Sequence, residues 1–192
     1  FGQNLTAVGG PQDWSKEGSF DFWFYGTGSG LAYQAEISDN RSNPSTDTSE
    51  RFDYTFVDTA AGWRLISIPF ADFTRAVDFQ PGGAPNDGFT LTEIWAWAIV
   101  LPLGADMVYF DDFGLGLTVI DDFESGLPFG SAVPNGEPLG FNTFQGDGSV
   151  AIQTASTPPA PTLPAAGTPN NVMQMDVNVS SFAGYIHAFE NA

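Results

Sequence analysis

The sequence of 192 residues is 42% hydrophobic and 15% aromatic, enough apolar surface to build a sizeable core, which excludes a mostly disordered chain. Its 23 acidic and five basic residues give a net charge of −18, which argues against binding to nucleic acids or to anionic membranes. No segment has the run of apolar residues that a membrane-spanning helix needs. Because cysteine is absent, core packing rather than disulfide bonds must hold the fold.

The first predicted strand is SFDFWFYGTGSG (19–30), which ends in a glycine-rich turn. Side chains on a strand point alternately to its two faces. One face would carry Phe20, Phe22 and Phe24, and the other Asp21, Trp23 and Tyr25. Both faces are therefore aromatic, and the pattern predicts that one lies in the core while the other is a binding surface or a second packing face.

Alternating segments continue through the first 117 residues. LAYQAEISDN (31–40) and RFDYTFVD (51–58) predict half-buried strands that flank a polar loop. GWRLISIPF (62–70) predicts a strand that ends at Pro69, because proline cannot donate a hydrogen bond to a neighbouring strand. A long loop with at most one helical turn follows, and residues 91–102 and 106–116 then predict two more strands.

The last 75 residues have a similar pattern. TVIDDFESG (118–126) starts a strand, and GSVAIQTAS (148–156) and NVMQMDVNVSS (171–181) predict two others. The segment between them is rich in proline and should be an extended surface loop. AGYIHAFENA (183–192) predicts a final strand. About nine to eleven strands in total favour an all-β, two-sheet sandwich.

Several segments together resemble carbohydrate-binding modules of family 11, which are jelly-roll domains found as repeats in long extracellular proteins. The most specific are WRLISIPFADFTR (63–75) and VYFDDFGL (108–115), supported by PQDWSKEGSFDFWFYGTGSG (11–30). In that family an Asp-Asp-Phe-Glu strand opens the domain and a segment like AGYIHAFEN closes its early part. Here both lie in residues 119–192, after the later part of the domain.

The order of the motifs is therefore permuted. Residues 1–117 correspond to the later part of the jelly roll and residues 118–192 to its opening part, with GLGLT as the boundary. Three explanations remain open: one period of a tandem array, a circular permutant, or strand exchange between successive copies. The absence of an initial methionine agrees with a chain processed or cut from something longer. Either the array or the exchange would assemble copies head to tail into a fibre.

Carbohydrate binding requires aromatic platforms for sugar rings and polar side chains for hydroxyl groups. The resemblance and the alternation together give six candidate residues, namely Trp23, Tyr25, Arg64, Trp95, Trp97 and His187. Gln34, Glu36 and Asp53 are further possible polar partners. The alternative is that these aromatic side chains belong to the core or to a contact between modules. His187, the only histidine, lacks the partners of a catalytic base, so a structural or polar role is favoured.

One short pattern occurs twice, as FDDF (110–113) and IDDF (120–123). Related jelly rolls often hold a structural Ca²⁺ where their first and last strands meet, and carboxylate oxygens are the ligands that Ca²⁺ prefers. The resemblance therefore implies five candidate ligands, Asp111, Asp112, Asp121, Asp122 and Glu124. The alternative is that these charges prevent unwanted strand pairing at a sheet edge.

The sequence shows no nucleotide-binding or zinc motif, and no pair of acids stands out among 23 as a hydrolase pair. We therefore predict a non-catalytic extracellular or cell-surface module. In one hypothesis it is a structural repeat whose copies join end to end into a fibre. In the other it is a glycan-binding module, for a β-glucan, attached to a hydrolase or an adhesin.

Overall fold

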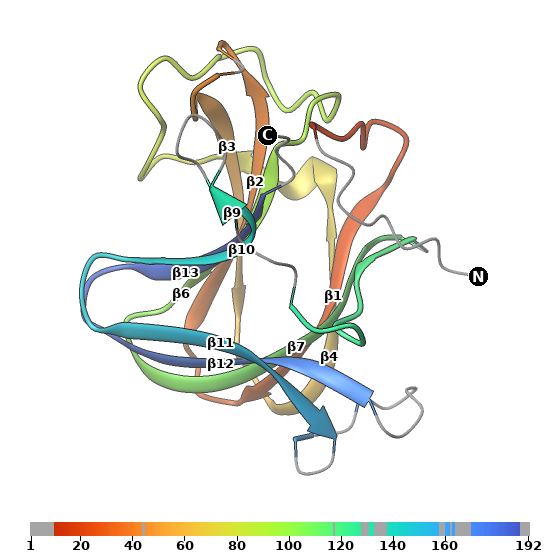
Figure 1. Cartoon of the computed structure of the whole chain (residues 1–192), viewed down its shortest axis with the longest axis vertical. Helices are drawn as coiled ribbons and strands as arrows, with labels where there is room; N and C mark the ends of the chain where they lie inside the picture. Colours follow the sequence, from red (N-terminus) through yellow and green to blue (C-terminus); the bar gives the residue numbers. More distant parts are fainter. Residues whose placement is uncertain are drawn as a thin grey trace.

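The computed structural model shows a sandwich of two antiparallel β-sheets (Figure 1). It describes residues 10–43, 45–116, 118–127, 131–132, 138–157, 160–161, 163 and 170–188. The predicted all-β sandwich is confirmed, and within these residues the helical structure is one short 3₁₀ turn, η1 (Phe70–Asp72). No helix in the described part of the chain has the length and apolarity to span a membrane.

The first sheet has the order β11-β12-β7-β1-β4, and β8 pairs with β7 beside this path. Its strands are β1 (Ser19–Thr27), β4 (Ala61–Pro69), β7 (Gly104–Leu115), β8 (Thr118–Asp121), β11 (Ser149–Thr157) and β12 (Asn170–Val179). The predicted alternation of β1 is confirmed, because its three phenylalanines are fully buried and the residues between them are only partly buried.

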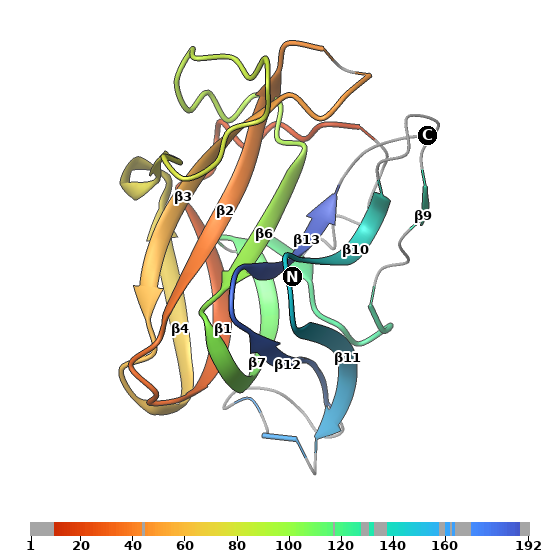
Figure 2. The same ribbon diagram turned by 90° about the vertical axis from the view of Figure 1, so that its left-hand side faces the viewer.

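The second sheet has the order β5-β3-β2-β6-β13-β10-β9. Its strands are β2 (Ala32–Arg41), β3 (Ser49–Val57), β5 (Thr74–Arg75), β6 (Ala96–Leu101), β9 (Ser131–Ala132), β10 (Pro138–Gln145) and β13 (Ala183–Ala188). Figure 2 shows β2, β3 and β6 running together along one layer of the molecule.

Strands from the two halves of the sequence pair within one chain. β12 pairs with β7 in the first sheet, and β13 pairs with β6 in the second. The two Asp-Asp copies are neighbours as well, because β7 and β8 form a tight antiparallel hairpin in which Leu115 pairs with Thr118. Both halves therefore contribute to both sheets, and the predicted boundary at GLGLT joins two paired strands.

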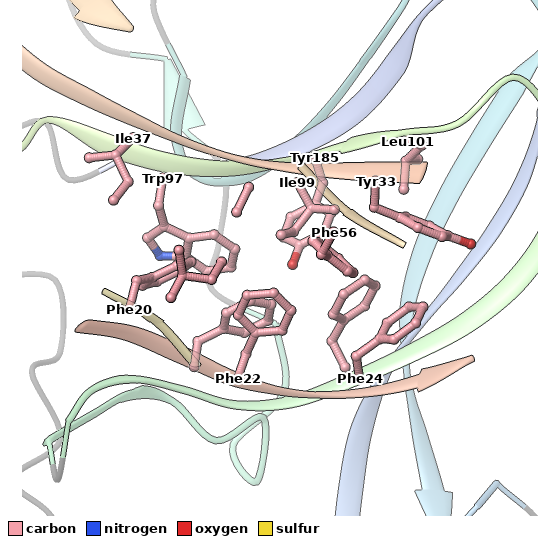
Figure 3. Close-up of a cluster of buried hydrophobic side chains, with 14 of the residues drawn as sticks. Phe20, Phe22, Phe24, Tyr33, Ile37, Phe56, Trp97, Ile99, Leu101 and Tyr185 are labelled. Atoms are coloured by element: carbon pink, nitrogen blue, oxygen red, sulfur yellow. The ribbon is translucent and has the colours of Figure 1, made fainter. Parts of the chain in front are cut away.

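Aromatic side chains fill the space between the sheets (Figure 3). Phe20, Phe22 and Phe24 point inward from β1, and Tyr33 and Ile37 face them from β2. Rings this close gain from dispersion and from edge-to-face or stacked contacts in addition to the burial of apolar area. The core therefore takes the inner faces of both sheets.

Candidate functional site

The structure separates the predicted sugar-contacting residues. Trp23 and Tyr25 lie half-buried on the outer face of β1, as the alternation predicted. Arg64 instead lies on the inner face of β4, where its guanidinium sits 5.4 Å from the centre of the Phe24 ring. It forms a 2.8 Å ion pair with the fully buried carboxylate of Asp58. Arg64 therefore closes one end of the core and does not share a surface with Trp23.

Trp95, Trp97 and His187 are buried as well. Trp97 is fully buried, with its ring centre 4.1 Å from that of Phe113. Trp95 is 8% exposed and lies under the Arg41 guanidinium, 4.2 Å from the ring centre. Trp97 therefore faces the core between the sheets, whereas Trp95 lies just before β6 and outside the core cluster, so the two rings do not form one exposed face for a sugar.

His187 is 2% exposed, and its Nδ1 lies 2.7 Å from Oδ2 of the buried Asp121. The two residues join β13 to β8 and lie 66 positions apart in the sequence. This agrees with the structural role favoured for His187, and it gives one oxygen of Asp121 a protein partner. The fully buried Tyr185 has a pKa well above its ordinary value, because burial and the nearby Asp121 charge oppose its ionisation.

A different surface gathers polar groups on the outer side of the second sheet. The strand registers align outward-facing residues in rows that run across β3, β2, β6, β13 and β10. One row is Asp53, Glu36, Ala98, Ile186 and Asn142. The next row is Thr55, Gln34, Val100, Gly184 and Phe144. Charged and amide side chains thus stand on β2 and β3, beside uncharged residues on β6 and β13 in the middle of the sheet.

Arg51 and Glu36 form the charged part of this surface. The Arg51 Nε lies 3.3 Å from Glu36 Oε1, and its Nη2 donates to Asp47 Oδ2 at 2.6 Å. Burial raises the pKa of Glu36 to about 7, an effect that Arg51 opposes and the nearby carboxylates of Asp78 and Asp53 strengthen. Burial, together with the Asp78 charge, also raises the pKa of Asp53. The Arg51 donors are used by Glu36, Asp47 and the Ser49 carbonyl, and its side chain is 6% exposed, so the half-buried Asp53 is the more accessible charged group.

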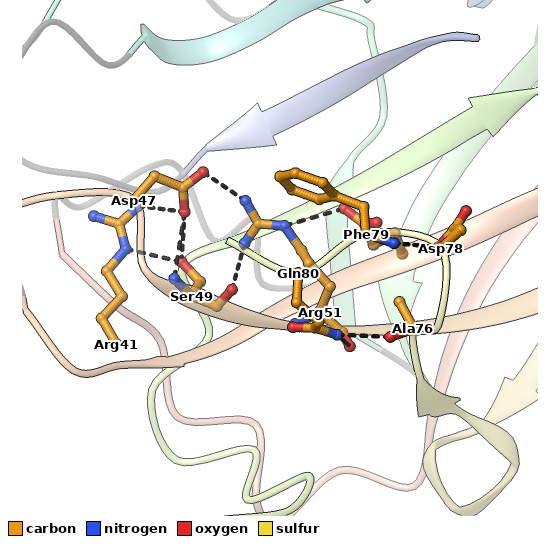
Figure 4. A network of polar contacts seen from close by, with 9 residues as sticks. Arg41, Asp47, Ser49, Arg51, Ala76, Asp78, Phe79 and Gln80 are labelled. Atoms are coloured by element: carbon orange, nitrogen blue, oxygen red, sulfur yellow. Dashed lines mark hydrogen bonds and ion pairs between the residues drawn. The ribbon is translucent and has the colours of Figure 1, made fainter. Parts of the chain in front are cut away.

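The segment after β5 places an exposed aromatic ring at the edge of this surface. The side chain of Gln80 accepts from the backbone N–H of Arg51 and donates to its carbonyl, at 3.0 and 2.8 Å (Figure 4). This pairing covers the edge of β3 and fixes the residue before it, Phe79, which is 58% exposed. At the other end of the sheet, the half-buried Phe144 lies over Gly184, where an added Cβ would be 2.5 Å from its ring.

We call this surface the polar face and define it by six residues, Gln34, Glu36, Arg51, Asp53, Phe79 and Phe144. Sequence reasoning identified the first, second and fourth as possible polar partners but missed the other three. The outward direction of Arg51 could have been inferred from its alternation with the inward Phe52, although its side chain is buried by its neighbours on that side. Phe79 and Phe144 lie on a loop and on a late strand, and only the tertiary pairing brings them to this sheet.

The Asp-Asp residues lie at the β7–β8 hairpin, but their contacts are with the protein. Asp111 is 1% exposed and accepts from Asn170 Nδ2 at 2.9 Å, while Glu124 Oε1 accepts from the backbone N–H of Asn171 at 2.9 Å. Burial raises the pKa of Asp111 to about 7 and also raises the pKa of Asp112.

Asp112 has a φ of 47° at a β-bulge, which interrupts the simple alternation assumed for the pair. Among the described residues, no three His, Asp or Glu side chains are grouped so that they could hold a metal ion. Asp122 Oδ1 accepts from the backbone N–H of Glu124 at 3.2 Å, and the calcium site stays a prediction.

Comparison with known proteins gives one match. The model of the carbohydrate binding domain of family 11 matches residues 4–115, which is more than half of the chain. No curated protein and no solved structure matches. The matched segment includes β1 to β7 and thus most of the polar face. The chain therefore belongs to the carbohydrate-binding domains of family 11.

Proposed function

We propose that this protein binds a neutral polysaccharide on the polar face. The observation that carries the proposal is the placement of Glu36 and Asp53, with the buried Arg51 beside them, on the outer side of one sheet between the exposed Phe79 and the half-buried Phe144. Carboxylates accept from sugar hydroxyls, a guanidinium donates to them, and aromatic rings take the apolar face of a sugar. Because the net charge is −18, a neutral polymer such as a β-glucan is favoured over an acidic one.

Affinity electrophoresis in gels that contain a soluble β-glucan, a xylan, a mannan or an acidic polygalacturonate tests the proposal. Retardation by at least one neutral polymer and not by the acidic one is expected. Asp53→Ala and Phe79→Ala should each weaken binding about tenfold or more, since a hydrogen bond to a charged group contributes about 1.5–3 kcal/mol and aromatic contacts contribute similarly.

Two variants serve as matched controls. Leu65 is 54% exposed and lies on β4 of the opposite sheet, so Leu65→Ala removes a comparable apolar side chain away from the polar face. Glu17→Ala removes an exposed acid outside it. If Asp53→Ala and Phe79→Ala are retarded in the gels as strongly as the parent protein, the polysaccharide binds at another surface of the chain.

Carbohydrate-binding modules of this family are non-catalytic. We therefore also propose that the chain is attached to a hydrolase or an adhesin at the cell surface. The chain itself should release no reducing sugar from a polymer that it binds. Measurable turnover that Asp53→Asn or Glu36→Gln abolishes would contradict this assignment.

End-to-end assembly, predicted from the permuted order of motifs, remains a prediction. β7 is paired on one side with β1 and on the other with β12 of the same chain, so a strand-exchanged polymer would first have to open such pairs. Electron microscopy of the purified chain distinguishes end-to-end assembly from a chain that stays monomeric. Filaments would support assembly, and dispersed particles at high concentration would exclude it for this segment.

A further inference from the structure

The sheet opposite the polar face carries a second line of ligand-type side chains. On the outer face of the first sheet, Tyr25 pairs with Trp63 on one side and with Tyr109 on the other. Gln174 pairs with Tyr109, and Gln153 pairs with Gln174. Three aromatic rings and two amides thus form one row across β4, β1, β7, β12 and β11. We call these five residues the aromatic row.

The rings of this row are in contact with one another and partly open to solvent. The ring centres of Tyr25 and Trp63 are 5.5 Å apart, and those of Tyr25 and Tyr109 are 5.8 Å apart, both in edge-to-face arrangements. All three residues are half-buried. The exposed Leu65 and Met107, at 54% and 47%, extend the apolar surface beside them.

Contacts at the sides of the row hold its members in place. The Trp63 indole N–H donates to the carbonyl of Pro161 at 3.3 Å, and the Tyr109 hydroxyl lies 3.3 Å from Met107 Sδ. The amide of Gln174 donates to the carboxylate of Asp176 at 3.0 Å. Side chains fixed before a ligand arrives lose less conformational entropy when it binds, which favours affinity.

We propose that the aromatic row is a second polysaccharide-binding surface, separate from the polar face and on the opposite sheet. Aromatic rings accept the apolar face of a sugar, and amides can both donate to and accept from its hydroxyls. Neighbouring strands lie about 4.8 Å apart, so five strands span about 19 Å, which is enough for several sugar units. Charged groups are absent from the row itself, which suits a neutral polymer.

Two surfaces on opposite sheets would let one domain hold two polysaccharide chains. A domain with two such surfaces should cross-link polysaccharide chains or bind one chain with higher avidity than a single site allows. The reason is that binding at the first site raises the effective concentration of polysaccharide at the second. A second copy of this protein is the alternative occupant of the row, and the experiment below separates the two.

The distribution of tryptophan provides a readout specific to the aromatic row. Trp14, Trp95 and Trp97 are buried, whereas Trp23 and Trp63 are half-exposed on the outer faces of β1 and β4. No residue that defines the polar face is a tryptophan. A sugar on the aromatic row should therefore change the emission of the chain and protect it from acrylamide quenching, while a sugar on the polar face alone should not.

The test titrates the chain with the neutral polymer that retards it most in gels, and follows fluorescence and isothermal calorimetry together. We expect a saturable emission change that survives in the double variant Asp53→Ala/Phe79→Ala. Tyr109→Ala should weaken this response about tenfold, whereas Tyr109→Phe, which keeps the ring, should retain it. Circular dichroism and the melting temperature show whether each variant is folded.

Three results would overturn the proposal. One is binding in calorimetry without any emission change, and another is loss of the change in the polar-face double variant, because then only the polar face binds. The third is an emission change that depends on protein concentration without sugar and disappears in Tyr109→Ala, which would identify the row as a contact between copies. Absence of binding to every neutral polymer would reject the proposed function as well, so the two failures are distinguishable.

Discussion

Asp58 shows how the fold accommodates a buried carboxylate. Its Oδ2 accepts from the backbone N–H groups of Thr27, Gly28 and Ser29, and its Oδ1 accepts from Arg64. Burial alone would raise the pKa of Asp58, but these hydrogen bonds outweigh burial and lower it. Gly26 is required beside it, because an added Cβ would lie 2.1 Å from Asp58 Oδ1. A single carboxylate therefore orders the whole β1–β2 turn.

Removing this carboxylate should strongly destabilise the fold. Asp58→Ala leaves three backbone N–H groups and the Arg64 guanidinium without their acceptor, and we expect a loss of about 3–5 kcal/mol in the free energy of unfolding. Asp58→Asn should lose less, because one side-chain oxygen remains. Urea denaturation measures both, and Asp13→Ala is the control because Asp13 accepts only from the exposed Ser15. Equal effects of the Asp58 and Asp13 substitutions would contradict the assigned role.

Glu36 makes the stability of the folded protein depend on pH. The direction is opposite to that expected from Asp58, because the pKa of Asp58 is lowered and that of Glu36 is raised. Its pKa is about 7 in the folded state and ordinarily 4.5, so between these values the folded state binds more protons than the unfolded state. The contribution of Glu36 to stability is therefore greatest below pH 4.5 and falls as the pH rises to 7.

Glu36→Gln should consequently be more stable than the parent protein above pH 7, by about 1–3 kcal/mol, since one pKa unit corresponds to about 1.4 kcal/mol. Near pH 4 the two should be equally stable. Thermal unfolding at pH 4, 6 and 8 checks the trend, with the exposed Glu17→Gln as control. A variant that is less stable at pH 8 would mean that the ion pair with Arg51 outweighs burial.

At the scale of elements, the β7–β8 hairpin explains the doubled Asp-Asp pattern. Phe113 pairs with Asp121 and Gly114 with Val119, so the register shifts at the extra residue Ile120 on β8. Asp121 then reaches His187 on β13 in the other sheet. The second copy of the pattern therefore links the two sheets through a buried pair.

These contacts lead to a prediction about metal removal. Because three of the five carboxylates, those of Asp111, Asp121 and Glu124, contact Asn170, His187 and Asn171, we expect excess EDTA to leave the melting temperature unchanged. Differential scanning calorimetry with and without chelator measures this. A fall of several degrees that Ca²⁺ reverses and Mg²⁺ does not would restore the calcium hypothesis.

For the molecule as a whole, net charge is the dominant long-range contribution to stability and to association between copies. A net charge of −18 on 192 residues opposes the compact state and the approach of other copies. The screening length falls from about 30 Å at 0.01 M salt to about 10 Å at 0.1 M. Any contact between copies should therefore be weakest at low ionic strength.

Salt should stabilise the folded chain for the same reason. Raising NaCl from 0.01 to 0.3 M should increase the melting temperature by a few degrees, because repulsion among the acidic residues is screened. KCl at matched ionic strength is the control and should act equally. A melting temperature that falls with salt would show that the exposed ion pairs contribute more to stability than the net charge costs.

The sequence by itself determined the class of fold and which residues of a strand share a face. In β1 the period places Phe20, Phe22 and Phe24 together, but Trp23 and Tyr25 make the other face aromatic too, so the period alone left open which face is buried. The resemblance also predicted the family that the comparison shows for residues 4–115. The same period predicted that Trp95 and Trp97 share a face, but it cannot say which face is buried.

Tertiary structure decided which side chains meet. Trp97 faces inward because β6 lies between β2 and β13 with Phe113 packed against it from the other sheet. The polar face and the aromatic row both exist because strand registers align residues that are far apart in sequence, such as Tyr25 with Tyr109. Alternation is a local property of one strand, whereas register and sheet order depend on long-range pairing. The sequence could therefore supply candidate residues, while only the folded sheets could sort them into core and surface.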